Sequence, residues 1–145
     1  MGGIIRCEVV PVSSIDTFSI MNGAVRITLK SGKSWKTLPI STRQTTAGAP
    51  PEKSEAGTTY AHQFITILPF SVYRGENMSF YCDLCRNGCL IRYTDANFRS
   101  RILGSKDYPL TGTFEEVSGE TATDIAGYRL ELKATCLHPQ LIDKV

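Results

Sequence analysis

The stretch Cys89–Gly104 reads CLIRYTDANFRSRILG and shows the kind of structure expected of the whole chain. Cys89–Thr94 is rich in β-branched and aromatic residues, which is typical of a strand. Asp95–Asn97 supplies the short polar side chains of a turn, and Phe98–Leu103 resumes a strand pattern that ends at Gly104. Two strands joined by so short a turn lie antiparallel, so the stretch predicts a hairpin.

Upstream of this hairpin, two further regions have strand patterns. Ile4–Val12 is rich in Ile and Val, and Pro11 near its end predicts a position near a sheet edge. In Val25–Lys30 apolar and polar residues alternate, which is typical of a strand with one face in solvent. Ser31–Lys33 has turn chemistry and Ser34–Leu38 follows with an extended pattern, so we expect these two strands to form a second hairpin.

Downstream, three more segments are expected to be strands. Thr59–Phe70 is apolar on both faces beyond Phe64, which predicts a central strand. Leu110–Val117 is extended after a proline, and Tyr128–Ala134 alternates between apolar and charged residues. The number and spacing of these strands predict a mostly antiparallel sheet.

The segment Gly75–Asn87 fits two structures. With a helical period, four apolar side chains share one face, Asn77 is a plausible N-cap, and Gly88 follows the last turn. The four are Met78, Tyr81, Cys82 and Cys85. With a strand period, Asn87–Gly88 would be the turn of a hairpin instead. The regular apolar spacing favours the helix, and the hairpin remains the alternative.

The length and composition predict one domain over residues 1–145. The chain has 145 residues, of which 41% are hydrophobic and 21% charged, so it can bury a core of its own. We therefore expect an α+β fold that is mostly β: an antiparallel sheet, curled toward a sandwich or barrel, with one packed helix.

Residues 39–58 are expected to form a long polar loop or arm. The segment is rich in Ser, Thr, Ala, Gly, Pro, Glu and Lys, and Pro50, Pro51 and Lys53 lie at its centre. Such a composition buries little apolar area, and loops of about 20 residues in compact domains are uncommon unless they are functional or disordered. These three residues are therefore candidate interface residues.

Charge is distributed unevenly along the chain. The formal net charge is only +2, far from the basic excess of a dedicated nucleic-acid binder. Residues 1–105 carry a net +5 and residues 106–145 a net −3. If folding keeps these charges in two patches, they suit a subunit that contacts copies of itself head to tail, which is the geometry of rings.

The cysteines suggest a metal site without establishing one. The spacing Cys82-x-x-Cys85-x-x-x-Cys89 would place two thiolates on one helical face, as zinc requires, but no second ligand pair follows. The helical stripe already explains Cys82 and Cys85 as packing residues. We expect no metal or other cofactor, and a zinc-stabilised binding module is the alternative. An odd number of cysteines, five, favours reduced thiols.

No catalytic grouping is visible in the sequence. His62 lies among apolar residues of an expected strand, and His138 precedes Pro139. The chain contains no hydrolase-elbow, phosphate-loop or dinucleotide motif. We therefore expect no enzymatic activity and assign no catalytic residues.

A basic, aromatic surface is a further possibility on the first hairpin. Arg92, Arg99 and Arg101, with Tyr93 and Phe98, are the residue types that single-stranded nucleic-acid binders use. The alternation places Phe98 opposite Arg99 and Arg101, which makes a poor stacking platform. We do not expect direct nucleic-acid binding, and it ranks behind the zinc-stabilised module as an alternative.

No targeting or membrane segment is expected. No apolar run reaches the about 18–20 residues that a membrane helix needs, and the N-terminal MGGIIR lacks the pattern of a secretory signal. We therefore expect a soluble protein with no membrane partner.

From Leu90 to His138 the chain resembles small, uncharacterised virion structural or assembly proteins of Bacteroides-type phages and prophages. The matching residues are Leu90–Asp95, Asn97, Ile102–Ser105, Tyr108–Leu110, Gly127–Leu132 and His138–Pro139. The group tends to have Asn-Gly where this chain has Asn97–Phe98. Since phenylalanine rarely adopts a positive φ, the turn type is open, and an exposed Phe98 is a candidate contact residue.

The resemblance implies a non-enzymatic virion subunit, made in the host bacterial cytoplasm and placed in the head-tail connector or tail. We expect it to assemble as a homo-oligomeric ring, with copies of itself and other phage structural proteins as partners. The candidate interface residues are Pro50, Pro51, Lys53, Phe98, Arg99 and Arg101.

Overall fold

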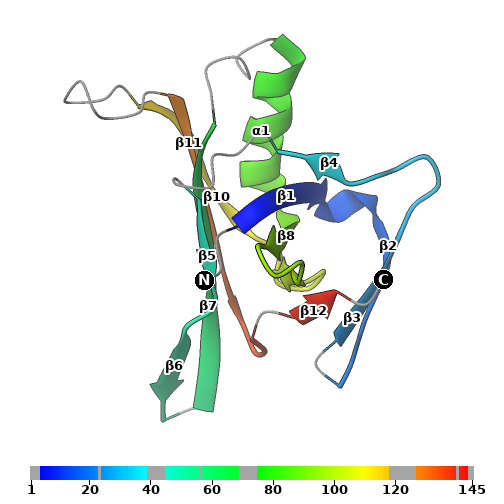
Figure 1. The fold of residues 1–145 in the computed structure, drawn as a ribbon, viewed down its shortest axis with the longest axis vertical. Helices are drawn as coiled ribbons and strands as arrows, with labels where there is room; N and C mark the ends of the chain where they lie inside the picture. The colour runs from blue at the N-terminus through cyan, green and yellow to red at the C-terminus, as the bar shows by residue number, and fades with distance from the viewer. Residues whose placement is uncertain are drawn as a thin grey trace.

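The computed structural model describes residues 4–22, 24–38, 45–55, 57–68, 75–117, 127–139 and 141–143. Within them the chain forms two β-sheets and one α-helix, arranged like a sandwich and not closed into a barrel (Figure 1). The expectation of a mostly β, α+β fold with one packed helix is confirmed.

The larger sheet has seven strands. They are β1 (Ile4–Pro11), β2 (Ile15–Met21), β3 (Ala24–Leu29), β4 (Lys36–Thr37), β8 (Cys89–Asp95), β9 (Ser100–Leu103) and β12 (Leu141–Asp143). Their order across the sheet is β2, β3, β12, β9, β8, β1, β4. A 3-10 turn, η1 (Val12–Ser14), joins β1 to β2.

The smaller sheet has five strands. They are β5 (Thr46–Gly48), β6 (Pro51–Ser54), β7 (Gly57–Leu68), β10 (Thr111–Val117) and β11 (Gly127–Cys136). Their order is β10, β11, β7, β5, and β6 pairs with the first residues of β7. The β6–β7 hairpin extends beyond the rest of the sheet (Figure 1).

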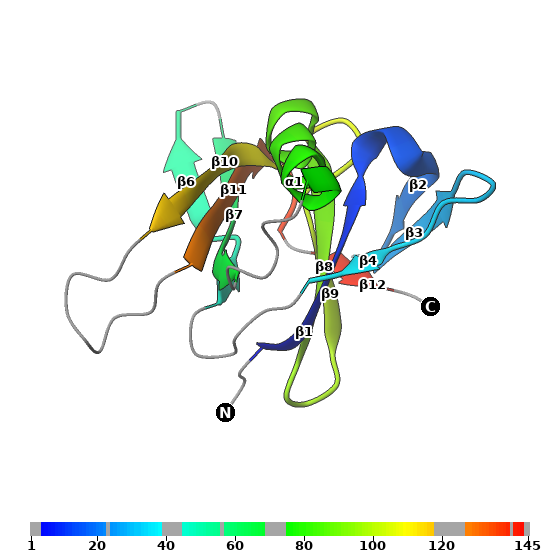
Figure 2. The same ribbon diagram turned by 90° about the horizontal axis from the view of Figure 1, so that it is seen from above.

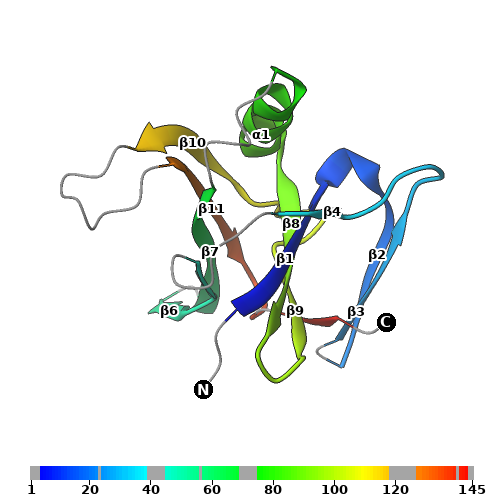
Figure 3. The ribbon, with the colours of Figure 1, turned by 45° about the horizontal axis from the view of Figure 1, so that its top comes forward.

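The central strands of the seven-stranded sheet bury both of their faces. Ile91 and Leu103 point toward the smaller sheet and belong to one hydrophobic cluster. Their neighbours Leu90 and Ile102 point the other way, into a second cluster that the β2–β3 hairpin covers. Figure 3 shows β1, β8 and β9 lying between the smaller sheet and that hairpin. The near-continuous apolar runs of these strands follow from this position, because a strand buried on both faces needs no polar alternation.

The five-stranded sheet buries only one face. Leu130 and Leu132 of β11 and Phe64 of β7 pack into the first cluster, whereas the alternate residues of both strands face outward. The alternation expected in Tyr128–Ala134 is therefore confirmed, with the apolar side inward. The outer face of this sheet is half-exposed along β7 and β11.

Helix α1 (Gly75–Asn87) confirms the helical alternative for this segment. It closes one end of the sandwich between β10 and β1 (Figure 2). The ring of Tyr81 stacks on Phe114 with centroids 5.2 Å apart, and Phe114 stacks on Tyr128 at 5.1 Å. Gly88 ends the helix with φ +102°, as expected of the residue after the last turn. Asn77 lies inside the helix, so its prediction as N-cap was wrong.

The hairpin expected between Val25–Lys30 and Ser34–Leu38 was wrong. β3 pairs antiparallel with β2, and β4 crosses to pair with β1. The turn that joins β2 to β3 contains Asn22–Gly23, a common two-residue hairpin signal, and Asn22 has φ +54°. This dipeptide could have located the true hairpin.

Part of the polar segment 39–58 is sheet and not loop. Within it lie β5, β6 and the start of β7, while residues 39–44 and 56 lie outside the described residues. All four residues of β6 are exposed, so this strand buries little apolar surface. It is held instead by backbone pairing, in which residues 51–54 pair with residues 57–60. The described residues of 51–60 thus form a β-ribbon that projects from the sheet.

Candidate functional site

The tip of the β8–β9 hairpin is a tightly bonded turn. The carboxylate Oδ1 of Asp95 accepts the backbone N–H groups of Asn97 at 2.9 Å and Arg99 at 3.0 Å. The backbone of Asp95 also accepts the N–H of Phe98 and donates to Arg99, at 2.9 and 3.0 Å. Asp95 thus organises the turn from both its side chain and its backbone, as aspartate commonly does in turns.

Phe98 sits in this turn with an unfavourable backbone conformation. Its φ is +60°, the left-handed region that glycine adopts readily and a bulky residue rarely does. Such a residue typically costs about 1–3 kcal/mol. The side chain is 82% exposed, so no packing within the described residues offsets that cost. Phe98 is therefore both strained and exposed, a combination that no contact within the described residues explains.

Two arginines accompany Phe98 on the same hairpin. Arg99 is exposed, and Arg101 is half-buried where β9 pairs with Tyr93 of β8 and Ile142 of β12. The N–H of Arg99, together with that of Asn97 and the nearby guanidinium charges, holds the pKa of Asp95 below its usual value. The carboxylate of Asp95, the only one in the turn, is therefore occupied by hydrogen bonds within the turn. The tip presents to solvent the aromatic ring of Phe98 and, next to it in the sequence, the guanidinium of Arg99.

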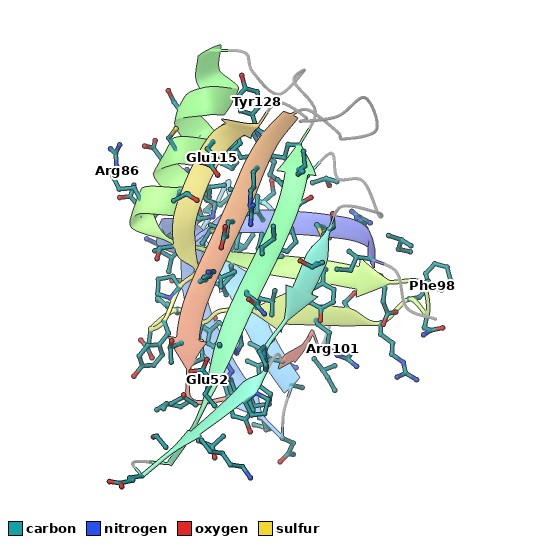
Figure 4. All side chains as sticks on the ribbon, turned by 90° about the vertical axis from the view of Figure 1, so that its left-hand side faces the viewer. Glu52, Arg86, Phe98, Arg101, Glu115 and Tyr128 are labelled. Carbon is teal, nitrogen blue, oxygen red and sulfur yellow. The ribbon has the colours of Figure 1, made fainter. Side chains whose placement is uncertain are left out.

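The other three candidate interface residues lie on a different element. Pro50 accepts the N–H of Ala61 at 3.0 Å, and Pro51 and Lys53 are exposed residues of the β6–β7 ribbon. That ribbon belongs to the five-stranded sheet, whereas Phe98 projects from the seven-stranded one (Figure 4). The structure therefore divides the six candidates between two separate projections.

The cysteines are arranged as packing residues. Cys89 and Cys85 are buried and belong to the first hydrophobic cluster. Burial raises the pKa of Cys85 and Cys136 to about 11 and that of Cys7 to about 12, and it raises the pKa of Cys89 further. Protonated thiols are poor nucleophiles and poor metal ligands. In the described part of the chain, no group of three or more His, Cys, Asp or Glu residues could hold a metal ion.

His62 has a structural hydrogen-bonding role in which both ring nitrogens are used. Its Nδ1 accepts the N–H of Gly104 at 2.9 Å, so the proton lies on Nε2, which donates to the carbonyl of His138 at 2.8 Å. The ring is fully buried, and burial lowers the pKa of His62 below its usual value. A neutral histidine with both nitrogens occupied joins β7 to the end of β9 and to the segment before β12.

The surface of arginines and aromatics considered for nucleic acid does not form. Tyr93 is 7% exposed and belongs to the first cluster. Arg92 binds the carboxylate of Glu8 through Nη2 at 3.0 Å and Nε at 3.1 Å, and its guanidinium lies 4.4 Å from the ring centre of Trp35. Of these five residues, only Phe98, Arg99 and Arg101 remain near the surface without a partner ring or carboxylate, among the described residues, of the kind that holds Arg92.

The structure also exposes apolar residues that sequence reasoning missed. Met21 is 75% and Ile142 50% exposed, beside a small groove of about 140 Å³ lined by Ser19, Ala24 and Arg26. Ala24 pairs with both Met21 and Ile142 across the sheet. The signal in the sequence was Asn22–Gly23, because a hairpin turn there places Met21 at the end of a strand.

Comparison with models of protein families, with curated proteins and with solved structures found no match to this chain. The resemblance to phage virion proteins therefore stays a prediction that rests on its short motifs. Across the described residues, no helix has both the length and the apolar character required to cross a bilayer.

Proposed function

We propose that this protein is a non-enzymatic structural subunit of a bacteriophage virion. In this proposal it assembles with copies of itself, as a ring in the head-tail connector or tail. The β8–β9 tip and the β6–β7 ribbon are its contact elements. The resemblance over Leu90–His138 supports the setting, and the strained tip supports the mode of action.

The observation that carries the proposal is Phe98. A free turn gains nothing from a bulky residue at φ +60°, where glycine would avoid the strain. Exposed aromatic residues on rigid elements are typical anchors of protein interfaces, since they bury a large area with little loss of side-chain entropy. The backbone strain of the free subunit has a purpose if the aromatic ring of Phe98 becomes buried in the contact between subunits.

The experiment compares two substitutions at this position. Phe98→Gly removes both the ring and the backbone strain, whereas Phe98→Ala removes the ring and keeps the strain. We expect both variants to lose self-association by analytical ultracentrifugation, and to lose incorporation into particles in an assembly reaction. Only Phe98→Gly should be more stable than the wild type, by about 1 kcal/mol in the free energy of unfolding, and should therefore unfold at a higher temperature.

The outcome of this comparison is decisive in either direction. A wild-type protein that remains a monomer at high concentration and joins no virion component would refute the proposal. Unchanged assembly of both variants would show that Phe98 is not the contact residue. The matched control is Asn97→Ala, whose side chain donates no hydrogen bond recorded in the turn and whose backbone N–H remains.

A further inference from the structure

The two layers of the fold carry opposite net charge. Among the described residues of 4–38, 89–110 and 141–143, which form the seven-stranded sheet, nine Lys and Arg accompany five Asp and Glu, a net +4. Among those of 45–88 and 111–139, which form the five-stranded sheet and α1, four accompany seven, a net −3. The charge asymmetry along the sequence thus becomes an asymmetry between layers.

The positive layer has one projecting contact element, and the negative layer has a face that could receive it. On the outer face of the five-stranded sheet, Ile65 and Ile67 are half-buried neighbours on β7. Glu115 of β10 lies on the same face, because β11 pairs Arg129 with both Glu115 and Ile67. An apolar strip therefore lies two strands away from a carboxylate.

Glu115 differs from the other charged groups on that face. Glu131 is held between Arg129 at 3.2 Å and Lys133 at 2.9 Å, so its carboxylate already pairs with two cations. Glu115 is exposed and makes no ion pair with any described residue. It is the carboxylate on this face that can accept a new cation without breaking an existing pair.

The projecting tip and the receiving face do not overlap. In Figure 4 the outer face of the five-stranded sheet faces the viewer, with Glu115 on it, while Phe98 projects at the margin of the molecule. One copy can therefore use both surfaces at once. A contact between two different surfaces of identical chains is heterologous, and it closes into a ring or continues as a filament.

We infer that the β8–β9 tip of one copy docks on the outer face of the five-stranded sheet of the next copy. Phe98 lies on Ile65 and Ile67, and the guanidinium of Arg99 pairs with the carboxylate of Glu115. This inference rests on the proposed function and specifies its partner surface: opposite layers of successive copies meet, so that the charge difference between layers is satisfied at every contact.

The test is a charge exchange between copies. Arg99→Glu and Glu115→Arg each place like charges at the contact, so each variant alone should self-associate at least tenfold more weakly than the wild type at low salt. When the two variants are mixed, every tip meets a face of opposite charge, and we expect association to return. The double variant should also associate.

Matched controls separate this contact from general charge effects. Asp83→Arg makes the same reversal at an exposed position of α1, in the same layer but outside both contact elements, and should leave association unchanged. All variants are first compared with the wild type by circular dichroism and thermal unfolding, since Glu115 and Arg99 are exposed and their replacement should not alter folding. Ile67→Lys should weaken association even in the charge-exchanged mixture.

Three results would overturn the inference. The first is a mixture that associates no better than its separate components. The second is a Glu115→Arg variant that assembles like the wild type. The third is a tip that binds another virion component while the chain alone stays monomeric; that result would keep the virion role in the proposed function but remove the self-assembly and with it the head-to-tail contact.

Discussion

Each sheet holds a carboxylate bound by cations, and the two sites differ in burial. In the seven-stranded sheet Glu8 binds Arg92 through two contacts of 3.0 and 3.1 Å and the exposed Arg6 at 3.4 Å. In the five-stranded sheet Glu131 binds Arg129 and Lys133 at 3.2 and 2.9 Å. The Glu8 side chain is 10% exposed and that of Glu131 is 24% exposed, with cations that are 42% and 63% exposed.

This difference shows how the two sheets divide their roles. The central strands of the seven-stranded sheet are packed on both faces, so the largely buried Glu8 and Arg92 depend on each other to compensate their charges. The five-stranded sheet leaves one face in solvent, where water compensates any charge that loses its partner. Its outer face can therefore vary, or bind another molecule, at little cost in stability.

The largest expected effect comes from breaking the buried pair. Glu8→Gln keeps the shape of the side chain but removes the charge that compensates Arg92, and we expect a loss of about 3 kcal/mol. Glu131→Gln on the outer face should leave the midpoint of urea unfolding almost unchanged. Equal effects of the two substitutions would contradict the division of roles between the sheets.

The next largest loss of stability is expected where the backbones of β10 and β11 come close together in the five-stranded sheet. A β carbon added at Gly112 of β10 would collide with the backbone of Glu131 on β11, whereas one added at Gly48 of β5 would meet nothing within 4 Å. We expect Gly112→Ala to cost about 3 kcal/mol, at the upper end for overpacking, because a backbone carbonyl moves less easily than a side chain. Gly48→Ala should be within about 0.5 kcal/mol of the wild type in thermal unfolding.

The smallest expected effect concerns His62, which links the two sheets through its hydrogen bonds. The pKa of His62 is lowered in the folded state, so the unfolded chain takes up its proton first as the pH falls. The stability from this group is therefore complete above the ordinary histidine pKa of about 6.5 and is lost below it, at up to about 1.4 kcal/mol per pH unit. Protonation at Nδ1 would also turn an acceptor into a donor facing the N–H of Gly104.

Urea unfolding between pH 7.5 and pH 5 measures this loss. His62→Gln should be less stable than the wild type at pH 7.5 and should show a flatter dependence on pH. His138→Gln is the comparison, since it keeps the backbone carbonyl that accepts from His62 and removes only the His138 ring, whose centroid lies 5.3 Å from that of His62. A pH profile that is the same in the wild type and in His62→Gln would show that another group is responsible.

Local patterns predicted the features that depend only on the sequence of the element itself. The β8–β9 hairpin followed from its turn residues, the amphipathic β11 from its alternation, and α1 from its helical spacing. The exposed Phe98 was also expected, because a turn residue has few neighbours that could bury it. Each of these inferences needs only the local chain.

Pairings between distant segments could not be predicted in this way. β4 pairs with β1 and β12 inserts between β3 and β9, and neither partner is indicated by local periodicity. The opposite charge of the layers likewise depends on which strands share a sheet. The hydrogen bonds of His62 to Gly104 and His138 span 42 and 76 residues, so no local motif could show them.

The position of β12 affects how the chain is made. It is the last described strand, yet it lies between β3 and β9, with Leu141 buried in the second cluster. Roughly 110 residues separate β3 from β12, which a ribosome adds in about 6–22 seconds. During that time the edge of β3 that later pairs with β12 has no partner. Neighbouring nascent chains on one mRNA can then pair with this edge through their own strands. Slower translation would prolong the time for which the edge is exposed.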